Sequence, residues 1–438
     1  MASIDDDFAF VTASAERAIA RQRQSCEQLC RTTTSKGEGL ASHAELMYSA
    51  VEDRITETRA NFSEAKDDLL RADVVVAMRQ LLNLIRGLQP NLDWLAAAIS
   101  PPLDLGTTYF VEDAARALVA PGVELTIVSG TTQGSYATTT DPWEPYLKQL
   151  GSGIPNDEPT IVVVFIPRRE EKTGLLHPLI IHELGHAADG EHGLVQQIWA
   201  EASTRKRFAK RFTSAVEGFA AAQDGVDQYA ARVHVSQLLS SWIAEALCDS
   251  IAAHCLGPTY LFSFIAEVVA GSLDEATPTH PPPRQRVRRL LDDLDRLGWA
   301  AMMSDEVGEL DNWIRDTAEV KIEYQEIDGF LHWAIDDLRA VIRRTARSHV
   351  GDALFAPEPE ELAEAKELLA AGIPPAQRMS GEAISRASII LSCWFGALSS
   401  AGLGPAALPD AVAGPELAEI LPAALEMSAL TSSWVPTP

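Results

Sequence analysis

An HExxH motif inside an apolar segment places the tightest constraint on how this chain folds. The motif is formed by His182, Glu183 and His186, and the other residues from 175 to 184 are mostly leucine and isoleucine. Because residues four positions apart share one face of a helix, both imidazoles can reach a single metal ion while Glu183 points to its open side. A buried helix can hold two histidines and a glutamate only if these polar groups find partners. The motif therefore predicts a zinc site on a buried helix, with Glu183 as the general base that takes a proton from water.

The third zinc ligand has two candidates. Glu245 and Asp249 stand four residues apart in an apolar helical segment, where two carboxylates on one buried face require a cation or hydrogen-bond donors. With Glu245 as a ligand and Asp249 as the acceptor for a ligand imidazole N–H, both carboxylates would be satisfied. The alternative is His192, which follows His182 at the HExxHxxGxxH spacing of metzincins. The turn position of that pattern holds Asp189 instead of glycine and no methionine follows closely, so Glu245 is favoured.

A further segment, Thr279-His280-Pro281-Pro282-Pro283, leads into a predicted helix. The order HExxH, ExxxD and Thr-His-Pro-Pro resembles the gluzincin metallopeptidases related to the CaaX prenyl proteases and the bacterial heat-shock membrane endopeptidases. This resemblance is confined to the part of the chain that carries these motifs. It implies that His182, His186 and Glu245 are the zinc ligands. It also implies that Glu183 is the general base and that Asp249 supports one of the ligands.

The resemblance also implies residues that support the site or stabilise the oxyanion. His280 is assigned a catalytic role, Arg284 or Arg286 supports the site, with Arg284 taken as the supporting residue, and Tyr260 is a candidate donor to the transition state. Many members of the family span membranes, whereas this sequence has no uninterrupted apolar segment of that length. Prenylated or membrane substrates are therefore not implied for this chain.

The chain is predicted to fold in three parts. Residues 1–100 have the apolar spacing of a helical hairpin or bundle, residues 101–300 contain the motifs, and residues 301–438 are helical in pattern. Alternation over 123–128 and the β-branched run over 160–166 predict strands within the central part. We therefore expect a predominantly helical α+β fold in which a gluzincin-like metallopeptidase core with a small sheet is flanked by helical regions.

Charge and cysteine content limit the partners and the compartment. The 36 lysines and arginines stand against 62 aspartates and glutamates, which gives a net charge of −26. Such a chain is not expected to bind nucleic acid or an anionic membrane, since both repel negative charge. Five scattered cysteines form no disulfide framework, and the acidic start is unlike a secretory signal. These features predict a cytoplasmic protein.

Together these features predict a zinc-dependent metallopeptidase that cleaves a peptide or protein substrate. The long helical regions around the motifs suggest a protease that stays latent until a protein partner activates it. One alternative is a zinc-binding regulatory or scaffold protein that acts through these helical regions, although an intact Glu183 favours catalysis. The other alternative is a zinc hydrolase that acts on bonds other than peptides.

Overall fold

The structure is a computed structural model that describes residues 3–32, 38–88, 105–120, 122–131, 136–155, 157–167, 174–268, 273–299, 325–351, 357–401 and 420–428. The predicted C-terminal region is therefore seen only in part, because 301–324, 352–356, 402–419 and 429–438 lie outside the described residues. The chain divides into two compact units. The first is formed by Met1–Pro102 and Gly122–Arg168, and the second by Leu103–Pro121 and Arg169–Pro438.

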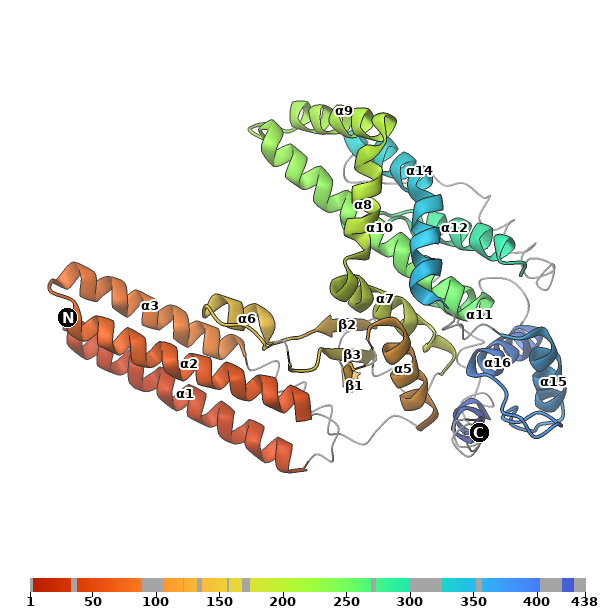
Figure 1. Ribbon diagram of the computed structural model, residues 1–438, viewed down its shortest axis with the longest axis horizontal. Helices are drawn as coiled ribbons and strands as arrows, with labels where there is room; N and C mark the ends of the chain where they lie inside the picture. The colour runs from red at the N-terminus through yellow and green to blue at the C-terminus, as the bar shows by residue number, and fades with distance from the viewer. Residues whose placement is uncertain are drawn as a thin grey trace. The chain divides into compact units, whose positions relative to one another are not determined.

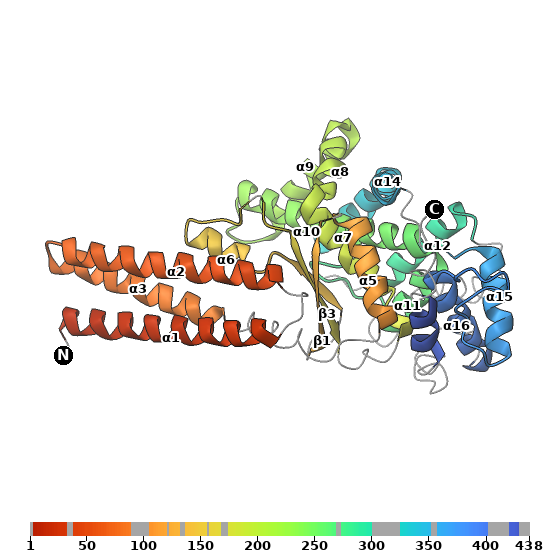
Figure 2. The ribbon, with the colours of Figure 1, turned by 60° about the horizontal axis from the view of Figure 1, so that its bottom comes forward.

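Three long helices make up most of the first unit: α1 (Ile4–Thr32), α2 (Glu38–Glu64) and α3 (Asp68–Gly87). They lie side by side in a bundle (Figures 1 and 2). Met47, Val51 and Ile55 follow one another at intervals of four residues, and all three are buried because this spacing keeps them on one face of α2. The apolar face of α2 therefore lies in the core of this bundle.

A three-stranded mixed sheet belongs to the same unit. Its strands are β1 (Glu124–Thr131), β2 (Ala137–Thr140) and β3 (Ile161–Pro167), with a short helix α6 (Glu144–Gln149) between the last two. The central strand β3 pairs in parallel with β1 and antiparallel with β2. Its alternate residues Ile161, Val163 and Phe165 join the core of the helical bundle. The sheet therefore packs with the N-terminal helices, whereas the sequence had placed it in one part with the HExxH motif.

The second unit consists, within its described residues, of helices and turns joined by short irregular segments, one of which contains an isolated antiparallel bridge between Gln377 and Ala383. Its elements are α5 (Leu105–Leu118), the 3-10 turn η2 (Gly174–Leu176), α7 (Leu179–His192), α8 (Leu194–Thr204), α9 (Lys206–Ala222), α10 (Gln228–Leu256), α11 (Pro258–Val268), α12 (Pro283–Arg296), α14 (Gln325–Val350), α15 (Pro359–Ala370), α16 (Arg386–Ala401) and a helix at 420–428. The expectation of a predominantly helical α+β protein with a small sheet is confirmed. None of the described helices is long and apolar enough to cross a membrane.

Helix α10 is the centre of the second unit. It contacts α7, α9, α12 and α14, which gather around it in Figure 1. Its residues from Leu247 to Leu256 are all buried, as expected for a helix that is covered on every side. The Asp227 carboxylate caps its first turn by accepting a hydrogen bond from the Ala230 N–H at 2.7 Å. Gly257, with φ of +56°, ends the helix and turns the chain into α11.

The contact between α7 and α10 depends on Gly185, the fourth residue of the HExxH motif. A Cβ atom added there would lie 3.0 Å from Cys248 Sγ and 3.2 Å from Cys248 Cα, which is closer than ordinary packing allows. The absence of a side chain at Gly185 therefore sets the separation of the two helices beside His182 and His186.

We predict that Gly185→Ala lowers the free energy of unfolding by about 1–3 kcal/mol, since the added methyl group meets the backbone of α10. Gly190→Ala is the matched control, because Gly190 is an exposed residue of the same helix with nothing within 4 Å of an added Cβ. There the better helix propensity of alanine is worth up to about 1 kcal/mol of stabilisation. Urea denaturation measures both variants, and equal effects would contradict the close contact.

Candidate metal centre

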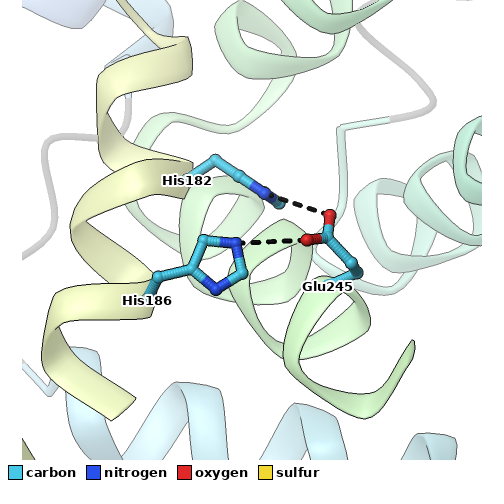
Figure 3. A group of neighbouring side chains, drawn as sticks. All are labelled: His182, His186 and Glu245. Atoms are coloured by element: carbon cyan, nitrogen blue, oxygen red, sulfur yellow. Dashed lines mark ion pairs between the residues drawn. The ribbon is translucent and has the colours of Figure 1, made fainter. Parts of the chain in front are cut away.

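Three side chains from two helices form a group that could hold a metal ion: His182, His186 and Glu245 (Figure 3). The histidines come from successive turns of α7, and the glutamate comes from the facing side of α10. His182 Nε2 lies 3.3 Å from Glu245 Oε2, and His186 Nε2 lies 3.2 Å from Glu245 Oε1. His182 and Glu245 are buried, whereas the His186 side chain is 32% exposed, so the group is open to solvent on the His186 side.

The donor atoms of this group fit zinc. Zinc binds imidazole nitrogen and carboxylate oxygen at about 2.0–2.2 Å, so tetrahedral geometry places two such ligand atoms about 3.3 Å apart. The two nitrogen–oxygen separations in this group, 3.3 and 3.2 Å, agree with that value. Two histidines and one glutamate are also a ligand set of catalytic zinc sites that keep an open position.

Asp249 and Tyr260 contact the Nδ1 atom of His182, on the side of the ring away from Glu245. His182 Nδ1 lies 3.1 Å from Asp249 Oδ1 and 3.1 Å from the Tyr260 hydroxyl, while that hydroxyl donates to Asp249 Oδ1 at 2.6 Å. This arrangement fixes the ring and leaves Nε2 directed at Glu245, as in other sites where a carboxylate orients a ligand histidine. Tyr260 is fully buried with its hydroxyl on His182 and Asp249, so it does not lie at the solvent-open side of the group, where a donor to a transition state would be needed.

Arg286 bridges the two buried carboxylates. Its Nη1 lies 2.9 Å from Glu245 Oε2, and its Nε and Nη2 donate to Asp249 Oδ2 and Oδ1 at 2.8 and 2.6 Å. The guanidinium carbon also lies 4.5 Å from the centre of the Phe264 ring. Arg284 instead forms its ion pair with Asp274 at 2.7 Å, so the structure puts Arg286, and not Arg284, beside the predicted ligands.

The charges of this network shift the pKa values of its members. Burial lowers the pKa of His182, but the negative charges of Glu245 and Asp249 outweigh burial and raise it to about 10. Burial raises the pKa of both carboxyls, but Arg286 and His182 outweigh it and hold the pKa of Glu245 and of Asp249 well below the ordinary range. Both carboxylates are therefore ionised at neutral pH, which a metal ligand requires.

Glu183 has a different electrostatic environment. Burial raises the pKa of its carboxyl above the usual value, and the neighbouring His182 and His186 act in the opposite direction. A carboxyl with a raised pKa is a stronger base than an ordinary one, which suits a group that accepts a proton from water.

His280 lies at the exposed edge of the group. Its Nε2 is 3.3 Å from Glu245 Oε1, its side chain is 52% exposed, and its Nδ1 is 2.8 Å from Thr279 Oγ1. The Thr-His-Pro-Pro segment thus reaches the same carboxylate that the two α7 histidines contact. The structure brings His280 to the predicted ligands, as the resemblance implied.

His192, the alternative third ligand, does not reach the group. Its Nε2 lies 2.6 Å from the backbone carbonyl of Val119, and its ring packs against His349 with centroids 5.0 Å apart. It lies at the end of α7, where it contacts the residue that follows α5. Of the two candidates considered from the sequence, only Glu245 is near His182 and His186.

The sequence reasoning took Arg284 as the supporting arginine, with Arg286 only as the alternative, and it did not identify the contacts of Tyr260 with His182 and Asp249. Arg286, Leu290 and Leu294 recur every four residues and are all buried, so helical periodicity could have placed Arg286 on the inner face of α12. No comparable signal reveals the direction of the Tyr260 hydroxyl.

Comparisons with known proteins do not assign the chain to a family: no protein-family model matches it, and neither a curated protein nor a solved structure does. The gluzincin resemblance accordingly rests on the motifs and on the geometry described above.

We predict that Arg286→Met destabilises the metal-free protein by about 3–5 kcal/mol, because it leaves two buried carboxylates without their cation. Arg284→Met removes an arginine two residues away whose ion pair with Asp274 lies outside the network, and we expect it to cost about 1 kcal/mol. Urea denaturation in the presence of a chelator measures both. A loss in Arg284→Met as large as that in Arg286→Met would show that the buried network is not a special source of stability.

Proposed function

We propose that this protein is a zinc-dependent metallopeptidase of the gluzincin type. The single observation that carries the proposal is the convergence of His182, His186 and Glu245, with His280 Nε2 3.3 Å from Glu245 Oε1. Glu183 follows His182 directly in the chain, and its carboxyl is close enough to be affected by the charges of the three converging side chains. The two histidines and the glutamate would hold the ion. A zinc ion bound by them supplies a Lewis acid that polarises a carbonyl group and lowers the pKa of water.

Within this proposal, Glu183 and His280 act on the reacting atoms. Glu183 takes a proton from the attacking water and passes it to the leaving amine, a role that its raised pKa favours. His280, at the solvent-exposed edge of the site, donates a hydrogen bond to the oxyanion that forms on the scissile carbonyl.

The remaining members of the network position the ligands. Asp249 and Tyr260 fix the ring of His182, and Arg286 holds Glu245 by a 2.9 Å contact to Oε2. The proposal thus gives a role to each of the charged side chains that meet at this group. A peptide or protein would be the substrate, because the resemblance is to peptidases.

We predict that the full-length chain, loaded with zinc and without any partner protein, cleaves peptides in a mixture of quenched-fluorescent peptides of varied sequence; such cleavage would also contradict the latent state suggested from the sequence. Glu183→Gln should lower kcat by at least about 100-fold while the zinc content stays unchanged, because the substitution removes the base but no ligand. Glu191→Gln is the matched control, since Glu191 is an exposed glutamate of the same helix. Wild-type activity in Glu183→Gln, or no cleavage by the zinc-loaded wild type, would contradict the proposal.

A further inference from the structure

A second candidate site lies between α12 and α14, which both pack against α10. A groove of about 480 Å³ separates them, within the size range of small-molecule sites. Polar side chains dominate its lining, which consists of Gln285, Arg288, Arg289, Asp292, Arg296, His332, Asp336, Asp337, Arg339, Ala340 and Arg343.

The lining of this groove is positive, although the chain as a whole is strongly negative. Five arginines and three aspartates line it, and Asp293 beside it pairs with Arg339 and Arg343, so arginines still outnumber carboxylates here in a protein whose net charge is −26. The positive charge is concentrated here by residues of two helices. An anion is therefore attracted to this groove and repelled by most of the remaining surface.

Several arginine donors in the groove have no acceptor. Arg289 Nη1 and Arg339 Nε are buried and form no hydrogen bond with any part of the chain that the structure describes. Arg288 is exposed and has no ion pair among the described residues. Buried donors are almost always satisfied in folded proteins, so these atoms indicate an acceptor that comes from outside the chain.

The aspartates of the groove already form ion pairs with arginines of the chain. Asp292 lies 2.7 Å from Arg339 Nη1, Asp336 lies 3.2 Å from Arg289 Nε, and Asp337 lies 3.5 Å from Arg205 Nη1. These ion pairs hold Arg289 and Arg339 in place while leaving one nitrogen of each without an acceptor. The aspartates thus orient the arginines but do not complete their hydrogen bonding.

We propose that this groove binds the phosphate group of a small phosphate monoester. A phosphate dianion is attracted to a groove in which arginines outnumber carboxylates, and its three terminal oxygens can accept from several guanidinium groups at once. The volume leaves room for the rest of a small molecule beyond the phosphate itself. The site is separate from the candidate metal centre, so this inference does not rest on the proposed peptidase activity.

Isothermal titration of the full-length chain with inorganic phosphate, and then with glycerol 2-phosphate, tests the proposal. A chelator in a low-salt chloride buffer keeps the titration independent of any metal. We expect saturable binding at one site per chain. Arg288→Gln should weaken it by at least about fivefold and Arg289→Gln by at least about tenfold, since each removes a charge-assisted hydrogen bond.

Arg347→Gln is the matched control, because Arg347 is an exposed arginine of α14 that does not line the groove. It removes the same charge and should change the affinity less than about twofold. Arg288 is exposed, so its variant remains informative even where Arg289→Gln fails to fold. No saturable binding at millimolar phosphate would overturn the proposal. An unchanged affinity in Arg288→Gln, or an equal loss in Arg347→Gln, would overturn it too.

Discussion

The ion pairs that Arg286 makes with Glu245 and Asp249 are the interaction on which the candidate metal centre depends. Two carboxylates buried on one helix face would repel each other and lose their hydration, so they need a cation nearby. Arg286 contacts both of them at 2.6–2.9 Å and lies over the Phe264 ring. Both carboxylates are thereby kept ionised. Glu245 faces His182 and His186 of α7, and Asp249 orients the His182 ring.

Helix α10 combines structural and chemical roles. It supplies Glu245 and Asp249 to the site, and Cys248 between them touches Gly185 of the HExxH motif. The same contact that packs α7 on α10 therefore sets the separation of the two histidines from the glutamate. Since α12 and α14 also pack on α10, the central helix connects the candidate metal centre with the arginine-lined groove.

Features that follow from the spacing of residues along one helix could be predicted from the sequence. Features that depend on how side chains are oriented in the folded protein, or on contacts between distant segments, could not. Spacings of four residues identified the α7 histidines and the pair Glu245 and Asp249, because that interval marks one helix face. The sequence favoured Arg284 over Arg286, although a separation of two residues turns these side chains to different faces of α12 and only Arg286 faces the site. The sequence analysis placed the sheet in the same part as the HExxH motif, because the strands lie close to the motif along the chain. The core that it shares with the N-terminal helices depends on contacts between segments far apart in the chain.

The central claim is that His182, His186 and Glu245 together bind zinc. Metal content, measured by mass spectrometry on the purified full-length chain after zinc reconstitution, tests it most directly. The account predicts about one zinc ion per chain in the wild type and in His192→Gln, and none in Glu245→Gln. Zinc that persists in Glu245→Gln but is lost in His192→Gln would contradict the ligand set, and no zinc in any sample would contradict the metal centre itself.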